Sequence, residues 1–297
     1  MIIQYNLTDH NAYQHIKDFY DWYPDWIVII TWQTWCGKTA LSLELYDEFG
    51  WDIISADSVQ VYRGLDIWSA KVSHDTQSRV SHHLIDYCDL DENFSVAQWQ
   101  KSCYEIVSQK RCCIVWWTWL YIDSMMYDLD LAIHSTDQHI RQYITDQDAL
   151  SPGRSYQQLM HHDPQTAHTL HPHATRFVTR ALEIYLVTGQ PKSQLMQRKA
   201  SRRDICLIVC EIDVDRWNEL LDLRISHMIE LWLIHETQNL LDIWASPDRK
   251  SMKSIWYKQT VEYIQDKYWY ADYIDRMQIA HHQLAKRQRT RNRRYNF

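Results

Sequence analysis

The sequence predicts an α/β fold in which a parallel sheet carries helices on both faces and a small helical insertion domain interrupts it. Three apolar, β-branched runs predict strands, at Ile27–Thr31, Asp52–Ala56 and Cys112–Val115. Helical stretches separate these runs, and strands joined by helices form parallel sheets that are covered on both faces. The pattern becomes polar, helical and rich in His and Gln from about residue 128 to 170, which indicates the insertion.

The same pattern divides the chain into four segments. These are an aromatic and polar leader at residues 1–25, the first part of the sheet domain at 26–127, the insertion at 128–171, and the second part of the sheet domain at 172–297 with a basic tail. The second part is expected to hold a strand at Cys206–Ile212 and helices at Thr175–Val187, Asp215–Thr237 and Ser254–Asp266.

The composition is that of a globular protein. Of 297 residues, 45% are hydrophobic and 23% are charged, and the apolar runs are too short to cross a bilayer. The first residues lack the pattern of a signal peptide, so a cytoplasmic location with reduced cysteines is expected. The net charge is −7, yet residues 286–297 hold basic side chains and no acidic one. This tail could follow nucleic-acid phosphates or be an ordinary solvated terminus.

A candidate phosphate-binding loop lies between the first predicted strand and the next helix. Gly37, Lys38 and Thr39 supply the last elements of the pattern G-x-x-x-x-G-K-[ST], in which backbone N–H groups surround phosphates and the hydroxyl holds Mg²⁺. Trp32 stands at the first glycine position. The alternative is a helix N-terminus with an ordinary capping Thr. The strand–loop–helix context favours a phosphate site and a P-loop NTPase-like sheet.

Longer segments resemble one known family. They are Ile53–Ile67 (IISADSVQVYRGLDI), His82–Asp86 (HHLID), Phe94–Gln100 (FSVAQWQ), Arg180–Pro191 (RALEIYLVTGQP), Ser254–Gln259 (SIWYKQ) and Gln283–Thr290 (QLAKRQRT). Together they resemble the tRNA dimethylallyltransferases of the IPP transferase family. The resemblance implies transfer of a dimethylallyl group from dimethylallyl diphosphate to the N6 amine of the adenosine 3′-adjacent to the anticodon, with release of diphosphate. It also implies a monomer that binds tRNA and no membrane.

The resemblance implies roles for individual residues. Asp57 matches the general base, Thr118 the residue that contacts the bridging oxygen of the leaving group, and Arg141 a position tied to transfer and tRNA contact. The implied diphosphate-binding residues are Trp32, Thr34, Trp35, Cys36, Gly37, Lys38, Thr39 and Arg224, with Mg²⁺ as the cofactor at Thr39. The implied tRNA-binding residues are Ser58, Val59, Gln60, Arg176, Arg180, Lys253, Trp256, Tyr257, Lys258, Lys286 and Arg287, of which the first three would line the pocket for a flipped base.

Simpler interpretations compete with these roles. Asp57 could cap a helix, and Arg176 and Arg180 could cover a helix surface with their aliphatic stems. Metal binding by the adjacent His82 and His83 is less favoured than a structural role. For the whole chain, the alternatives are a P-loop kinase acting on a small molecule or nucleotide, and an inactive tRNA-binding protein.

Tryptophan and glycine are present in unusual proportions. The chain has 15 Trp and 5 Gly, whereas Gly usually takes roughly 7% of a chain. Many of these Trp stand where the family has Gly: Trp32, Trp35, Trp51, Trp68, Trp116, Trp117, Trp232 and Trp256, and often Trp119. One repeated substitution among intact neighbours predicts that the source organism reads a single codon, the opal triplet, as glycine. If the tryptophans are real, the chain is expected to be inactive.

Overall fold

The computed structural model describes most of the chain. The described residues are 2–6, 16–19, 21–23, 26–31, 37–115, 118–127, 137–195, 205–211, 213–243, 246, 252 and 254–292. The chain forms two compact units. Unit 1 comprises Met1–Phe94, Lys101–Ile122 and Arg203–Phe297, and unit 2 comprises Ser95–Gln100 and Asp123–Arg202.

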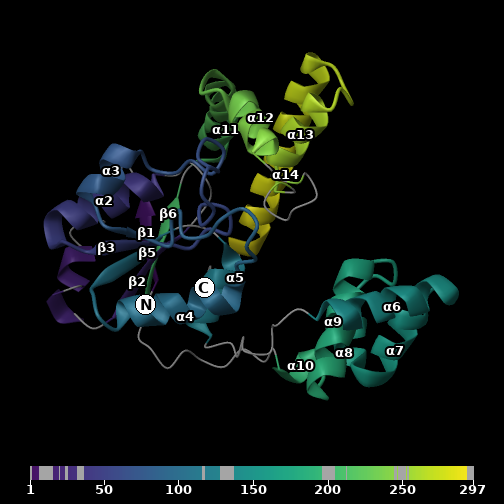
Figure 1. Cartoon of the computed structure of the whole chain (residues 1–297). Coiled ribbons are helices and arrows are strands. Elements are labelled where there is room, and N and C mark those ends of the chain that lie inside the picture. The colour runs from purple at the N-terminus through teal and green to yellow at the C-terminus, as the bar shows by residue number, and fades with distance from the viewer. Residues whose placement is uncertain are drawn as a thin grey trace. The chain divides into compact units, whose positions relative to one another are not determined.

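Unit 1 is built on a six-stranded parallel sheet with the strand order β1-β6-β2-β5-β3-β4 (Figure 1). The described β2, β3, β5 and β6 confirm the predicted strands and the parallel α/β fold. The edge strand β1, inside the predicted leader, and the two-residue β4 are not among the predicted strands. The strands are β1 (Ile2–Asn6), β2 (Ile27–Thr31), β3 (Asp52–Ser55), β4 (His82–His83), β5 (Cys112–Val115) and β6 (Ile205–Glu211).

The register of the sheet aligns the carboxyl ends of three strands. Val115 of β5 lies opposite both Ile30 of β2 and Ser55 of β3. All residues of these strands are buried, because helices cover both faces of the sheet and apolar side chains can pack on either side. The segments that follow β2, β3 and β5 therefore leave the sheet at one edge, where ligands bind in folds of this kind.

Helices follow most of the strands. In Figure 1, α2 and α3 lie on one side of the sheet, and α4, whose residues 101–107 belong to unit 1, lies on the other. α2 begins after Gly37 and ends before Gly50, both of which have the positive φ that Gly adopts readily. The helices of unit 1 are α2 (Lys38–Phe49), α3 (His74–Arg79), part of α4 (Val96–Val107), part of α5 (Trp119–Met126), α11 (Val214–Glu230), α12 (Leu233–Asp242), α13 (Tyr257–Ile264) and α14 (Tyr270–Asn292).

Unit 2 is helical. Its core packs Leu159, Ala167, Val178 and Ala181, which come from three different helices. The remaining helices of this unit are α6 (Gln138–Leu150), α7 (Arg154–His162), α8 (Pro164–Ala167), α9 (Thr175–Thr188) and α10 (Lys192–Leu195).

Unit 2 extends beyond the predicted insertion at residues 128–171. α9 was expected in the sheet domain, but its buried face packs on α7 and α8, so the compact unit continues to Arg202. The loop before α9 is therefore a connection inside unit 2. Among the described residues, no helix is long and apolar enough to cross a membrane.

Candidate active site

The first helix after β2 begins at the predicted phosphate loop. Gly37 has a φ of 86° and precedes Lys38, which is buried, and Thr39, which is half-buried. Thr39 lines a small cavity of about 20 Å³ together with Ser55 and Gln60. The structure thus places this helix start beside the end of β3. The other predicted loop residues, Trp32, Thr34, Trp35 and Cys36, lie outside the described residues.

Asp57 stands just beyond the end of β3. Its Oδ1 accepts hydrogen bonds from the backbone N–H of Val59 at 2.6 Å and of Gln60 at 3.2 Å, and the residue is 3% exposed. No α-helix begins at this position, so the two bonds close a local turn instead of capping a helix. They fix the direction of a buried carboxyl group at the carboxyl edge of the sheet.

Thr118 links the end of β5 to the end of β3. Its Oγ1 accepts a hydrogen bond from the N–H of Ser58 at 3.2 Å, and its own N–H donates to the carbonyl of Ala56 at 3.2 Å. Thr118 is therefore bonded to both neighbours of Asp57. Residues 58 and 118, 60 positions apart in sequence, therefore meet where the two strands end.

Gln60 holds the turn after Asp57 in place. Its Oε1 accepts a hydrogen bond from Ser55 Oγ at 2.9 Å, and its Nε2 donates to the carbonyl of Ser69 at 2.9 Å. The side chain is buried and uses both ends of its amide inside the protein. This arrangement shows a positioning role for Gln60, while its contact with a flipped base stays a prediction, as it does for Ser58 and Val59.

Arg224 brings a buried positive charge into this site from α11. It is 1% exposed, and its Nη2 donates to the carbonyl of Trp68 at 2.8 Å. Burial lowers the pKa of Arg224 to about 9, and the charge of Asp57 acts in the opposite direction. Because that pKa remains above neutrality, the guanidinium stays charged near Asp57. A guanidinium buried in this way has lost its hydration and is suited to bind an anionic ligand.

Two indole rings that contact each other pack against one side of this guanidinium. The Arg224 Cζ lies 5.7 Å from the ring centroid of Trp68 and 5.1 Å from that of Trp256, and the two indoles are 4.0 Å apart. His281, 0% exposed, packs against Trp256 from α14. Burial, followed by the Arg224 charge, lowers the pKa of His281 to about 2, so this imidazole is neutral.

Three predicted arginines lie in unit 2. Arg141 Nε and Arg180 Nη1 both donate to Glu183 Oε2, at 2.8 and 2.6 Å, and Arg176 is exposed on the same helix as Glu183. Glu183 is 0% exposed and also accepts from the N–H of Asp137 at 2.9 Å. The structure therefore shows Arg141 and Arg180 in a structural cluster, and their roles in transfer and tRNA contact stay predictions.

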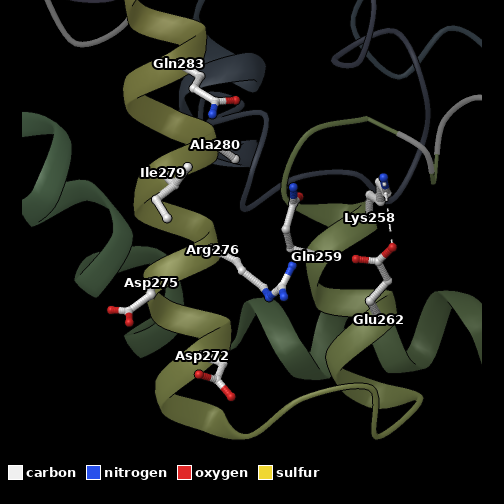
Figure 2. Close-up of a pocket in the computed structure, with 9 residues that line it drawn as sticks. All are labelled: Lys258, Gln259, Glu262, Asp272, Asp275, Arg276, Ile279, Ala280 and Gln283. Atoms are coloured by element: carbon white, nitrogen blue, oxygen red, sulfur yellow. Dashed lines mark ion pairs between the residues drawn. The ribbon is translucent and has the colours of Figure 1, made fainter.

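The predicted tRNA contacts of unit 1 differ in exposure. Lys286 and Arg287 are exposed on α14, whereas Trp256 and Tyr257 are each 0% exposed, so either aromatic residue would have to become uncovered to touch RNA. Lys258 lies in a groove of about 460 Å³ between α13 and α14 (Figure 2). Lys253 falls outside the described residues.

The groove in Figure 2 carries mixed charge. Lys258 points toward Glu262 at 3.9 Å, and Arg276 stacks over the Tyr268 ring at 4.7 Å. Glu262, Asp272 and Asp275 supply three carboxylates to the same lining. Because carboxylates outnumber the cations, this groove is poorly suited to an RNA phosphate chain.

Sequence patterns gave no signal for Glu236, which organises the loop before Trp68. Its Oε2 accepts from the N–H groups of Asp66 at 3.1 Å and Ile67 at 3.0 Å, and its Oε1 accepts from the Tyr257 hydroxyl. Burial raises the pKa of Glu236, and burial together with the Glu236 charge raises that of Tyr257. Glu236 is one of several polar residues in α12 (LIHETQNLLD), so nothing in the pattern singles it out.

The two adjacent histidines of β4 have separate partners. His83 Nε2 lies 2.8 Å from Asp52 Oδ2, and His82 Nδ1 lies 2.7 Å from the carbonyl of Val80. Within the described ranges, no group of His, Cys, Asp and Glu side chains could hold a metal ion. These contacts agree with structural roles for both residues.

Comparisons with known proteins give the family. A family model described as IPP transferase matches residues 60–295. A tRNA dimethylallyltransferase from Pelotomaculum thermopropionicum is 31% identical over 276 residues, covering 91% of this chain and 88% of that protein. One from an Exiguobacterium species is 35% identical over 272 residues, covering 89% and 86%.

Solved structures agree with this result. The tRNA isopentenylpyrophosphate transferase of Bacillus halodurans superposes with a TM-score of 0.64 at 29% identity, over 91% of this chain and 87% of that one. A eukaryotic dimethylallyltransferase acting on tRNA reaches a TM-score of 0.76 at 24% identity, over 88% and 68%, which shows the shared fold. From the matched family model and these relatives, the chain belongs to the IPP transferase family.

Proposed function

We propose that this protein modifies tRNA by moving a dimethylallyl group from dimethylallyl diphosphate to the N6 amine of the adenosine 3′-adjacent to the anticodon. Two observations carry the proposal: Thr118 accepts a hydrogen bond from Ser58, next to Asp57, where β3 and β5 end, and the charge of Asp57 acts on the buried Arg224. These contacts support a site that combines a fixed carboxyl group, a hydroxyl and a buried positive charge. Its relatives are tRNA dimethylallyltransferases, and no comparison supports a kinase.

The reaction needs one base and a stabilised leaving group. The N6 nitrogen attacks the allylic carbon, the carbon–oxygen bond breaks, and its electron pair leaves with the diphosphate. Asp57 takes the N6 proton, a role that contributes roughly 10²–10⁴-fold to rate. Thr118 and Arg224 would stabilise the negative charge that grows on the diphosphate.

The start of α2 fits a diphosphate with Mg²⁺. Gly37 provides the positive φ that turns backbone N–H groups toward a ligand, and Lys38 adds charge. Thr39 follows at the start of the helix, and the Ser/Thr hydroxyl at this position of the loop pattern is an oxygen donor of the kind that suits Mg²⁺. Thr39 would hold the ion, and the ion would neutralise charge on the diphosphate. Residues 34–37 would complete the loop.

Basic residues on both units support tRNA binding. Arg176 in unit 2 and Lys286 and Arg287 in unit 1 are exposed, so their charges can reach phosphates. We expect the protein to act as a monomer in the cytoplasm.

The test compares full-length variants with labelled dimethylallyl diphosphate and an anticodon stem-loop. The assay uses a glycine-restored chain, which carries Gly at positions 32, 35, 51, 68, 116, 117, 232 and 256. In that chain Asp57→Asn should lose about 10²–10⁴-fold in transfer, because the Asn oxygen still accepts the Val59 and Gln60 N–H groups but cannot take the proton. Asp75→Asn, at an exposed carboxyl on α3, is the matched control. Full transfer by the Asp57→Asn chain, or ATP turnover without transfer, would contradict the proposal.

A further inference from the structure

The loop of residues 65–71 touches the candidate site through two of its backbone carbonyls. The carbonyl of Trp68 accepts a hydrogen bond from Arg224 Nη2 at 2.8 Å. The next carbonyl, that of Ser69, accepts from Gln60 Nε2 at 2.9 Å, and the Gln60 N–H in turn closes the turn at the proposed base. The position of this loop therefore sets the direction of a buried guanidinium and of the turn that carries the base.

Internal contacts make this loop a unit. The N–H of Lys71 donates to the carbonyl of Asp66 at 3.2 Å. The Ser69 hydroxyl donates to the carbonyl four residues earlier at 2.5 Å. The Lys71 ammonium also bonds to Asp66 at 2.7 Å and anchors the end of the loop to Asp86 at 2.5 Å. A displacement at the start of the loop is therefore passed on to the two carbonyls that face the site.

Glu236 of α12 holds the start of the loop. Its Oε2 accepts hydrogen bonds from the N–H of Asp66 at 3.1 Å and of Ile67 at 3.0 Å, directly before Trp68. Its Oε1 accepts from the hydroxyl of Tyr257, a residue of α13 that is 0% exposed. One side chain thus ties the loop to two helices, and none of its contacts is with the proposed base or with Arg224.

Apolar packing holds the loop against α12 only in part. Gly64 and Ile67 border a cleft of about 300 Å³ whose other wall is α12. The two segments approach closely at Gly64, where a Cβ would lie 3.2 Å from Leu240 Cδ2. Because the cleft separates the loop from α12 beside Ile67, the directional hydrogen bonds to Glu236 decide where the start of the loop lies.

We propose that Glu236 is a positioning residue for prenyl transfer: by holding the 65–71 loop, it places the two carbonyls that orient Arg224 and Gln60. This inference rests on the proposed function, because the two oriented side chains serve that reaction. The role depends on the length of the side chain and on its acceptor atoms. A glutamine can accept both N–H groups with its oxygen and donate to the Tyr257 hydroxyl with its nitrogen, whereas an aspartate is one methylene too short.

Hydrogen–deuterium exchange in the full chain tests whether Glu236 holds the loop. Glu236→Ala should speed exchange in peptides from residues 65–71 at least about tenfold, because two N–H groups lose a charged acceptor. Peptides from β2 and β5 should keep their native rates, and Glu236→Gln should stay near the native loop. Glu219→Ala, which removes an exposed ion pair with Arg216 on α11, is the matched control and should leave the loop unchanged.

Single-turnover transfer tests the effect on the reaction. The glycine-restored chain is held in excess over a labelled anticodon stem-loop, with saturating dimethylallyl diphosphate. The backbone carbonyl of residue 68 is present with either side chain there. The rate constant then reports folded complexes alone, so a variant that merely unfolds in part keeps the parent value. Glu236→Ala should lower it about 10–100-fold, because a displacement of about 1 Å can cost about 10²-fold.

Two conservative variants separate position from charge. Glu236→Gln keeps the length and loses the charge, and it should recover most of the rate constant. Glu236→Asp keeps the charge but is shorter, and it should remain slow. The control Glu219→Ala should transfer at the parent rate, because its carboxylate is exposed on the surface of α11. If Glu236→Ala does not fold, the aspartate variant takes its place in both experiments.

The outcomes of the two experiments are distinguishable. Native exchange of the loop in Glu236→Ala would overturn the inference, whatever the transfer activity. An aspartate variant at the parent rate beside a slow glutamine variant would also overturn it, because charge and not position would then matter. Faster loop exchange in a parent chain that transfers nothing to RNA would support the hold of Glu236 on the loop and contradict the proposed function.

Discussion

Glu183 provides a sharp test of how unit 2 is held together. Its buried carboxylate accepts three hydrogen bonds, from the Asp137 N–H, Arg141 Nε and Arg180 Nη1. These contacts join α9 to the first turn of α6. Glu183→Ala removes all three and leaves two guanidinium groups without their shared partner.

The expected cost follows from the burial of each partner. Removing one side of a buried ion pair costs about 3–5 kcal/mol, because the remaining charge stays desolvated. The side chains of Arg141 and Arg180 are 41% and 20% exposed and can turn to water, so the lower end, about 3 kcal/mol, is expected for Glu183→Ala. Glu183→Gln keeps the shape and an acceptor oxygen, and should cost about 1–2 kcal/mol.

The loss should also depend on pH. Burial raises the pKa of Glu183, but the bonds from Arg180, Arg141 and Asp137 outweigh it, so the pKa is lowered from 4.5. A lowered pKa contributes stability that is present above the unfolded value and is lost as the pH falls through the folded value. The difference between the native chain and Glu183→Gln should therefore be full near neutral pH and shrink in acid.

Hydrogen–deuterium exchange of peptides from residues 137–195 reports the opening free energy of this unit inside the full chain. Peptides from the sheet serve as the internal reference. Exchange in Glu183→Ala that matches the native chain to within about 0.5 kcal/mol, or a Gln variant whose deficit grows in acid, would refute the reasoning.

Three further substitutions probe unit 1 by urea denaturation. Tyr257→Phe removes one of three hydrogen bonds to the half-buried Glu236 and should cost about 1–3 kcal/mol; no change would show that the hydroxyl contact is absent in solution. Lys71→Met removes an ammonium that bonds to Asp66 and Asp86 from a side chain that is 3% exposed. The expected loss of stability is only about 2 kcal/mol, because both carboxylates left behind reach water, and a gain in stability would contradict this. Trp217→Ala should cost about 3–5 kcal/mol by leaving a cavity, and a cost under about 1 kcal/mol would show that the helix contact is loose.

The sequence predicted those features that rest on local pattern. The central strands are continuous apolar runs, which gave their positions, and the helical stretches between them gave their parallel pairing. β1 was missed because its run IIQYN mixes polar with apolar residues, and β4 because two residues carry no periodicity. The end of unit 2 was misplaced because the break before α9 resembles a boundary, whereas burial assigns the helix to its neighbours.

The site residues also fall into those that local pattern predicted and those that it did not. The strand ends were predicted to carry the candidate site residues, and in the structure the segments after β3 and β5 meet through the hydrogen bond from the Ser58 N–H to Thr118 Oγ1. The position of Arg224 followed only from the family resemblance, because nothing in α11 marks one buried arginine. Glu236 was missed because its partners at Asp66 and Ile67 lie 170 and 169 positions away in the chain. Contacts at that distance leave no trace in local periodicity.

The strand order has a consequence for the growing chain on the ribosome. Among the described strands, β1 pairs only with β6, and β6 also lies beside β2, so β1 gains its described neighbour once residue 211 has been made. Chains fold from the N-terminus as they emerge, and long-range parallel pairing is slow. The helical unit, complete by residue 202, can therefore fold while β1 is still unpaired. The sheet is completed only in the last third of synthesis, when β6 has been made.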